Sequence, residues 1–290
     1  MIVPRPGDVC AVFVTYHPDA GFRDRVQRLL PQVGGAVIID NHSEPRALAM
    51  LREIAAATGS ELVENDDNHG VATALNQGMR HAKQRGFRWV ITFDQDSLAA
   101  PNLIENMLDV CAALGERELD RLGVLGTNHL DRNSRRTHVP LVDGRAFIEQ
   151  KTVITSGSLM SVPAYDAIGP FREDLFYGSI DHEYCLRARA KGYGVLIALE
   201  PLLEHAIGEQ TRRFTVNYAA PRWYYVVRNA LLVSKQYLAR DPGWAVWRTY
   251  RLLGRSAGVL LLEPQRLEKA RYMLFGARDA LLGRSGKLRE

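Results

Sequence analysis

The sequence predicts an α/β fold of the Rossmann-like class, in which a largely parallel sheet is flanked by helices. Short apolar runs rich in valine and isoleucine alternate with longer segments in which apolar residues recur every three or four positions. The apolar runs are followed by polar or acidic residues, which mark the ends of strands. Strands that alternate with helices in this way pair in parallel through right-handed crossovers.

The expected elements follow one another in a regular order. We expect strands at 9–16, 35–41, 61–64, 89–93 and 123–127, and helices at 19–31, 45–58 and 70–85. Residues 138–161 have the strand and turn character of a mixed extension of the sheet. Further helices are expected at 181–191 and 221–238, and a basic helical stretch follows from residue 244.

Acidic residues follow the carboxyl ends of the expected strands. Asp40 closes the second strand, and Asp94 and Asp96 follow the apolar run that ends at Phe93. Ligands of a doubly wound sheet bind in the crevice beyond these strand ends. Paired carboxylates at such a place suit Mg²⁺ or Mn²⁺, ions that also hold a substrate phosphate. The motif alone leaves a second interpretation open, a solvated acidic turn that ends a strand.

The charge distribution divides the chain into two parts. Residues 212–290 carry 16 Lys and Arg against 5 Asp and Glu, whereas residues 1–211 carry 21 against 28. We therefore expect an α/β domain over 1–211 and a basic helical region over 212–290. A basic region attached to an acidic body favours an anionic partner, either a membrane surface or a nucleic acid. Charged residues make up 24% of the chain and apolar residues 46%, which excludes a largely disordered protein.

Several classes of protein are excluded because their motifs are missing. No Gly-x-Gly-x-x-Gly follows the first strand and no P-loop sequence occurs, so neither kind of glycine-cradled nucleotide site is expected. The three cysteines are too widely spaced for a disulfide framework or a zinc site. The first residues lack the apolar core of a signal peptide, and no apolar run reaches the roughly 18 residues of a membrane span. The expected location is the cytoplasm.

A series of motifs, each weak alone, occurs in a specific order and spacing. It includes Thr-Tyr-His-Pro at 15–18, Asp-Asn-His-Ser at 40–43, Asn-His-Gly at 68–70, Asp-Gln-Asp-Ser at 94–97, Ser-Gly-Ser at 156–158, Asp-His-Glu at 181–183, Glu-His at 204–205 and Tyr-Tyr-Val-Val-Arg-Asn at 224–229. Over roughly residues 9–235 the series resembles the inverting glycosyltransferases of family 2, which have the GT-A fold. Within that family, the motifs at 94–97 and 224–229 are most similar to those of bacterial rhamnosyltransferases that use dTDP-L-rhamnose.

The resemblance implies a donor site at the strand ends. Thr15, Tyr16 and Asn68 would belong to the nucleotide-sugar site, and Asp40 would accept the imide N–H of a thymine or uracil ring. Asp94 would approach the ribose or the metal.

A divalent metal belongs to the same implied site. Asp96 would ligate Mg²⁺ or Mn²⁺ on the diphosphate, with Asp94 beside it. His205 matches the position of a further metal ligand, and imidazole is an acceptable partner of oxygen ligands for manganese. The alternative for His205 is an ordinary histidine at a strand end.

The same resemblance places the catalytic base at Asp181. Inverting transfer needs a base on the side of the sugar opposite the diphosphate, so the metal-binding aspartates cannot serve. The alternative for Asp181 is a helix N-cap, and Glu183 is expected to be a supporting contact. Arg228 is expected to hold the diphosphate, for which a guanidinium is well suited.

The basic region suggests a contact with a membrane. Arg248, Arg251 and Arg255 recur at three and four residues beside Trp244 and Trp247, the pattern of a basic amphipathic helix with interfacial aromatic residues. The alternative is a helix that packs on the body of the protein or on a second subunit, which leaves a homodimer open.

The leading hypothesis is an inverting, metal-dependent glycosyltransferase with a donor half at about 1–128 and an acceptor half at about 129–211. It would move L-rhamnose from dTDP-L-rhamnose to a glycan or polyprenyl-linked glycan in bacterial cell-surface polysaccharide synthesis. It would act as a peripheral protein at the inner face of the cytoplasmic membrane. UDP-galactofuranose and UDP-GlcNAc are alternative donors.

A nucleic-acid-associated protein is the hypothesis from another class. It lacks a supporting motif, and its acidic body suits phosphate poorly, so no nucleic-acid partner is expected.

Overall fold

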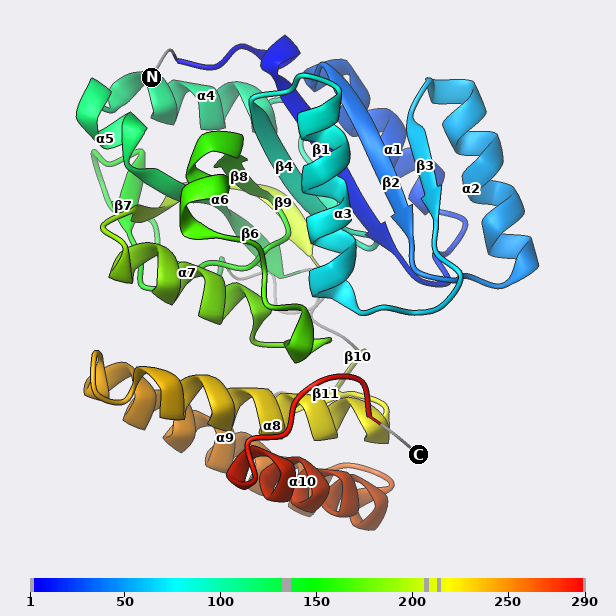
Figure 1. Cartoon of the computed structure of the whole chain (residues 1–290), viewed down its shortest axis with the longest axis vertical. Coiled ribbons are helices and arrows are strands. Elements are labelled where there is room, and N and C mark those ends of the chain that lie inside the picture. The colour runs from blue at the N-terminus through cyan, green and yellow to red at the C-terminus, as the bar shows by residue number, and fades with distance from the viewer. Residues whose placement is uncertain (1–2, 132–136, 206–208, 213–214, 289–290) are drawn as a thin grey trace. The chain divides into compact units, whose positions relative to one another are not determined.

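The computed structural model (Figure 1) describes residues 3–131, 137–205, 209–212 and 215–288. The chain forms two compact units, one of residues 1–171 and 184–206 and the other of residues 172–183 and 207–290. The division differs from the one expected at 211/212, because residues 172–183, which include Asp181, belong with the C-terminal helices. It falls inside a single helix, α7 (Ile180–Ala190).

The first unit is built around one sheet, to which nine of the described strands belong. The strands are β1 (Val9–Thr15), β2 (Gly35–Asp40), β3 (Glu61–Glu64), β4 (Trp89–Asp94), β5 (Leu98–Ala99), β6 (Leu122–Asp131), β7 (Phe147–Glu149), β8 (Ser158–Ser161) and β9 (Gly194–His205). Their order is β3-β2-β1-β4-β8-β6-β9-β5, and β7 pairs with β9. β3, β2, β1 and β4 run parallel, whereas β8 is antiparallel to both of its neighbours. The sheet is therefore mixed, as the sequence predicts.

Helices cover both faces of the parallel half of the sheet (Figure 1). The helices of this unit are α1 (Phe22–Leu29), α2 (Pro45–Thr58), α3 (Val71–Gln84), α4 (Leu103–Ala113), α5 (Glu116–Asp120) and α6 (Val162–Ile168). Side chains alternate across a strand, so Phe13 of β1 packs with Phe22 of α1 and with Phe93 of β4, at ring-centroid distances of 5.6 and 5.5 Å. α1, α2 and α4 share this core.

α3 lies against β1 and β2. A side-chain carbon built on Gly78 would lie 2.2 Å from Cγ1 of Val12, so only glycine lets the helix approach the sheet this closely. The close approach matters for function because α3 begins directly after Asn68 and Gly70, beside the ends of the strands.

The second unit is mainly helical. It contains α8 (Ala220–Tyr237), α9 (Pro242–Leu262) and α10 (Arg266–Leu281), preceded by the antiparallel pair β10 (Glu209–Arg212) and β11 (Thr215–Asn217). Its apolar core is formed by side chains of all three helices, namely Trp223, Val227, Ala230, Leu252, Val259 and Met273. The predicted α/β class with a C-terminal helical extension is confirmed. α10 lies inside the region expected to be helical, although no separate helix was placed at its position.

Candidate functional site

The strand order makes the carboxyl end of β1 the expected ligand-binding edge of the sheet. The crossover from β1 leads to β2 on one side, and β4 pairs with β1 on the other, so β1 lies at the topological switch point of the parallel strands. Ligands of open α/β sheets bind outside the strand ends at such a point. Thr15 ends β1, Asp40 ends β2 and Asp94 ends β4, so the structure brings three of the predicted residues to this place.

Asp40 is held firmly at the end of β2. Its carboxylate is 1% exposed and accepts hydrogen bonds from the Thr15 hydroxyl at 3.1 Å, the Ser43 backbone N–H at 2.9 Å and the Ser43 hydroxyl. The register of the parallel pair places Thr15 directly beside Asp40. Three donors satisfy and orient the buried carboxylate. Its contact with a nucleobase N–H stays a prediction.

The middle residue of the Asp-Gln-Asp motif links β4 to the loop after β1. The Gln95 side-chain carbonyl accepts a hydrogen bond from the Tyr16 backbone N–H at 2.7 Å, and its backbone carbonyl accepts one from the Arg25 guanidinium at 2.9 Å. Arg25 is itself fixed by an ion pair with Asp19 at 2.9 Å. Sequence reasoning assigned no role to Gln95 or Arg25. In the sequence, the only indication of a role for Gln95 is its position between Asp94 and Asp96.

A pair of serines, Ser156 before β8 and Ser97 of the motif itself, supports the backbone of Asp94. The Asp94 backbone N–H donates to the Ser156 hydroxyl at 3.1 Å, and that hydroxyl donates to the Ser97 hydroxyl at 2.8 Å. Gly157 has a φ of +72°, and a side-chain carbon there would lie 2.5 Å from the Thr127 methyl group. This glycine therefore permits close packing within the protein itself.

The pairing of β5 with β9 brings the backbone of His205 toward the acidic motif. β5 and β9 are antiparallel with Leu98 opposite Glu204, the residue before His205, and Leu98 follows the motif after a single residue, Ser97. The side chain of His205 lies outside the described residues. Asp94 and Asp96 are both partly exposed.

The donor set fits a divalent ion in its chemistry. Two carboxylates on a turn, with a histidine backbone brought beside them, suit Mg²⁺ or Mn²⁺. In the described part of the chain, no group of three or more His, Cys, Asp and Glu side chains is already gathered for metal binding.

Asn68 lies in the loop that leads from β3 into α3. Its side-chain oxygen accepts a hydrogen bond from the Gly70 backbone N–H at 3.0 Å, and Gly70 has a φ of +87° just before the helix begins. The loop is also tied to β2, because the His69 backbone N–H donates to the Asn41 side chain at 3.1 Å. Asn68 thus shapes the backbone at the start of α3, beside the strand ends.

Asp181 occupies the first turn of α7 in the second unit. Its carboxylate accepts hydrogen bonds from the backbone N–H of His182 and pairs with the His182 ring nitrogen Nδ1, both at 2.8 Å. Asp181 is the second residue of the helix, and its recorded hydrogen bonds go to the next residue. An N-cap side chain bonds two or three residues further on, so the geometry does not show the capping alternative.

The electrostatic surroundings keep Asp181 ionised. Burial pushes its pKa upward, but the charge of His182, the hydrogen bonds from His182 and the charge of Arg248 outweigh burial, and the pKa lies below its usual value. Arg248 of α9 donates to the Ser179 hydroxyl at 3.4 Å, and the His182 ring lies 6.0 Å from the Trp244 ring. An ionised, partly exposed carboxylate is what a general base requires. Sequence reasoning overlooked His182, although it is the neighbour of Asp181 in the motif.

Glu183 is fully buried in the same unit. Its carboxylate lies 3.5 Å from the Tyr237 hydroxyl. A base must reach the substrate, which a fully buried carboxylate does not do. The burial of Glu183 therefore agrees with the supporting contact that we expect of it.

Arg228 requires a correction. Its side chain is fully buried, and its five N–H groups donate to five acceptors of the same unit, the side chains of Tyr224 and Asn229 and the backbone carbonyls of Asp174, Leu175 and Gly286. A guanidinium has five N–H donors, so none is left for a diphosphate. Arg228 is a structural residue here. The prediction that Arg228 holds the diphosphate was therefore wrong. The sequence could not show this, because the carbonyls that Arg228 binds lie more than 50 positions away along the chain.

The comparisons with known proteins agree with this geometry. Residues 24–116 match the family model described as Glycosyl transferase family 2. The chain is 26% identical over 245 residues to the dTDP-rhamnosyl transferase RfbF of Shigella flexneri, a match that covers 79% of this chain and 80% of that protein.

Two solved structures are similar in fold. The mannosyltransferase PcManGT from Pyrobaculum calidifontis, in complex with GDP-Man and Mn²⁺, has a TM-score of 0.60 at 15% identity, and the match covers 97% of this chain and 88% of that one. TarS of S. aureus has a TM-score of 0.60 at 13% identity over 94% of this chain, which spans about half of TarS, or 48%. At these identities the likeness concerns the fold alone.

Proposed function

We propose that the chain is a family 2 glycosyltransferase and that it transfers L-rhamnose from dTDP-L-rhamnose in a metal-dependent, inverting reaction. The observation that carries the proposal is the gathering of Thr15, Asp40 and Asp94 at the switch point of the sheet, with Tyr16 tied to the Asp-Gln-Asp motif. The likeness to a dTDP-rhamnosyl transferase supports this choice of donor over UDP-galactofuranose and UDP-GlcNAc.

The donor would bind across the ends of the parallel strands. Asp40 would receive the imide N–H of thymine, and Tyr16, whose ring is exposed, would lie beside the nucleoside. Asn68 would contribute through the start of α3. Asp94 would approach the ribose. The side chains of Gln95 and Ser156 accept hydrogen bonds from the backbone N–H groups of Tyr16 and Asp94, and these bonds would keep the motif in place.

Asp94, Asp96 and His205 would hold Mg²⁺ or Mn²⁺. When bound, the ion neutralises charge on the diphosphate and eases its departure. The chain has no P-loop to do this. The fold relative PcManGT, solved with GDP-Man and Mn²⁺, supports a metal in this fold.

Asp181 would be the general base. The acceptor hydroxyl would give its proton to the Asp181 carboxylate while its oxygen forms a bond to the anomeric carbon. The bond from that carbon to the diphosphate oxygen would break on the opposite side, so the anomeric configuration is inverted. The lowered pKa of Asp181 means that the carboxylate is unprotonated before the reaction, as a base must be. A lower pKa also makes the carboxylate a weaker base, so the case for this role rests on the position of Asp181 in the motif.

The acceptor would be a glycan on a lipid carrier, reached at an anionic membrane surface through α8, α9 and α10. None of the described helices has the length and apolar character needed to cross a bilayer. Exposed cations on these three helices include Arg222, Lys235, Arg251, Arg266, Arg271 and Arg278. Cations near such a surface each contribute about 1 kcal/mol to binding.

Thermal denaturation in a panel of nucleotide-sugars tests the donor. With Mn²⁺ present, dTDP-L-rhamnose is expected to raise the midpoint more than UDP-galactofuranose or UDP-GlcNAc, because binding to the folded state stabilises it. Without Mn²⁺ the rise should shrink. A larger rise with one of the UDP-sugars would contradict the choice of L-rhamnose.

A further inference from the structure

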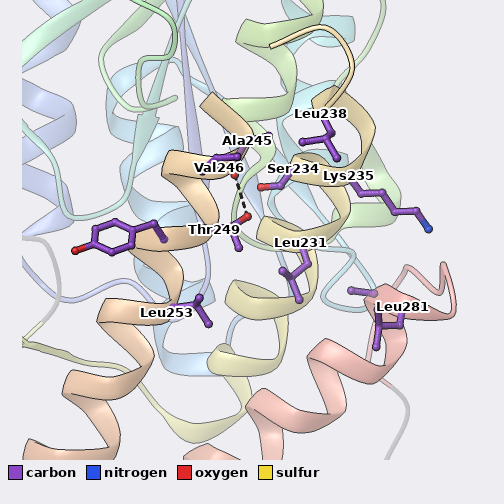
Figure 2. Close-up of a pocket in the computed structure, with 11 residues that line it drawn as sticks. Leu231, Ser234, Lys235, Leu238, Ala245, Val246, Thr249, Leu253 and Leu281 are labelled. Atoms are coloured by element: carbon purple, nitrogen blue, oxygen red, sulfur yellow. Dashed lines mark hydrogen bonds between the residues drawn. The ribbon is translucent and has the colours of Figure 1, made fainter. Parts of the chain in front are cut away.

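An apolar groove lies between α8 and α9 beside the end of α10, all within the second unit (Figure 2). Its volume is about 490 Å³, within the roughly 300–1,000 Å³ of sites that take small molecules. Leu231 and Leu238 line it on the α8 side, Val246 and Leu253 on α9, and Leu281 on α10. The groove is large enough for a ligand and belongs to no part of the sugar-transfer site described above.

The lining offers contact with hydrocarbon and very few hydrogen bonds. The Thr249 hydroxyl donates to the Ala245 carbonyl of its own helix at 2.9 Å, so it is already satisfied (Figure 2). The Ser234 hydroxyl is buried, and within the described residues it has no hydrogen-bond partner. The other polar side chains of the lining are Lys235 and Tyr250. A sugar or nucleotide would need more polar partners inside the groove than this lining provides.

The apolar lining is open to solvent. Val246 and Leu253 are each 63% exposed and Leu281 is 80% exposed. The exposed surface continues along α9 through Trp247 and Tyr250. A connected apolar surface of this kind marks a place where a partner or ligand binds.

The surrounding charges select an anionic occupant. Lys235 lines the groove with its aliphatic stem, and its ammonium group points away from the apolar lining (Figure 2). Two acidic residues of the region, Glu263 and Asp279, are buried and paired with Lys269 and Arg278. The exposed charge around the helices is therefore mainly positive, and an apolar chain with a negative head group complements it.

We propose that this groove holds the hydrocarbon chain of the phosphate-linked lipid that carries the acceptor, with Lys235 beside the phosphate. α9 lines the groove with Ala245 and Val246, and it carries Arg248, whose charge acts on Asp181. One helix thus contributes to the lipid groove and to the surroundings of the candidate base, which favours the acceptor's lipid over a bulk lipid. The identification of the occupant as the acceptor's lipid rests on the proposed function. The preference of the groove for a hydrocarbon chain does not, because it follows from the apolar lining.

A chain-length series of alkyl phosphates tests the proposal on the full chain. Octyl, decyl and dodecyl phosphate, each kept below its micellar concentration, are titrated by calorimetry. Each added methylene group that enters the groove should tighten binding up to about fourfold. Lys235→Gln should weaken all three ligands by a similar factor and leave the dependence on chain length unchanged.

Matched double variants locate the binding. Val246→Gln with Leu253→Gln places two amides in the groove at exposed positions, so the fold should persist. This variant should lose the dependence on chain length. Leu267→Gln with Leu274→Gln makes the same change at exposed positions of α10 outside the groove. This control variant should keep the dependence of affinity on chain length. Equal behaviour of the two double variants would overturn the proposal.

Other occupants give different results. A dimer in sedimentation that the groove variant abolishes, with alkyl phosphate binding unaltered, would assign the groove to a second copy of the chain. Equal competition by short-chain phosphatidylglycerol would assign it to a bilayer lipid. Either result contradicts the proposal.

Titration with dTDP-L-rhamnose separates the groove from the catalytic proposal. Both double variants should keep wild-type donor affinity. A wild-type chain that shows the expected dependence on chain length but binds no nucleotide-sugar would refute the proposed function and leave the groove's preference for hydrocarbon intact. Donor binding without a dependence on chain length would refute the groove alone.

Discussion

The Asn229 side-chain amide of α8 donates to the backbone carbonyl of Tyr177 at 2.7 Å, although the two residues lie 52 positions apart. The same amide donates to the carbonyls of Leu175 and Gly178 at 2.7 and 3.1 Å. Phe176 and Ser179 have φ values of +61° and +58°, a region that residues other than glycine seldom occupy. The side chain of Asn229 therefore holds a strained segment that leads directly to Asp181.

Asn229→Ala should lower kcat while the affinity for the donor stays at the wild-type value. The substitution removes the amide that donates to three buried or partly buried carbonyls. The segment before Asp181 then loses its position, and the free energy of unfolding falls by about 2–4 kcal/mol. Steady-state kinetics below the unfolding midpoint measure the first effect. Gln236→Ala on the same helix is the control, since its bond to Arg172 is at the surface. An unchanged kcat in Asn229→Ala would show that the segment needs no such support.

Asp181→Asn should keep donor binding and reduce kcat by about 10²–10⁴-fold, the usual contribution of a general base. The amide matches the carboxylate in shape but cannot accept the proton. Asp166→Asn, at a half-exposed surface pair with Lys83, is the matched control and should retain full activity. Wild-type turnover in Asp181→Asn would remove Asp181 from the mechanism.

The lowered pKa of Asp181 sets the expected pH dependence. The carboxylate contributes stability above its ordinary pKa of about 3.9, and this contribution is lost as the pH falls through the lower value in the folded protein. The profile of kcat/KM against pH should therefore show no acid limb from Asp181 above about pH 4. Arg248→Gln removes a positive charge that lowers this pKa, so its acid limb should move upward. The assignment of Asp181 as the base would be contradicted if the wild-type profile of kcat/KM had an acid limb near pH 6 and Arg248→Gln did not move it.

Much of the first unit could be predicted from the sequence because its signals are local. The expected helix 45–58 and strand 61–64 match α2 and β3 at both ends, and β1, β2 and β4 match to within a residue. Alternating apolar strands and amphipathic helices leave few topologies. The order of the strands then brings Thr15, Asp40 and Asp94 to one edge.

The second unit was harder to predict because its buried groups are polar. The bounds of α10 were not predicted, since Lys269 and Asp279 point inward. Lys269 pairs with Glu263 at 2.8 Å, and Asp279 accepts a hydrogen bond from Tyr224 at 2.8 Å. Such pairs disturb the apolar periodicity on which helix prediction depends. Arg228 was misassigned for a related reason, because a buried arginine that bonds distant carbonyls has the same local sequence as one that binds a ligand.

Gly78→Ala should destabilise the first unit by about 1–3 kcal/mol, since the added methyl group would overlap with Val12 and push α3 away from β1. The midpoint of urea unfolding, followed by circular dichroism, measures the loss. Gly7→Ala is the control, because a methyl group there meets open space and should leave the midpoint nearly unchanged. A midpoint equal to wild type in Gly78→Ala would mean that the packing of α3 on the sheet can relax.

The central claim is metal-dependent transfer of L-rhamnose, and its most direct test is the fate of dTDP-L-rhamnose with the purified chain, Mn²⁺ and a lipid-linked glycan fraction. We expect the donor to be consumed and a rhamnoside of inverted anomeric configuration to form. The reaction should stop with EDTA or in Asp96→Asn, while Asp166→Asn should react like wild type. A rhamnoside that retains the donor's configuration, or undiminished transfer in EDTA, would contradict the account.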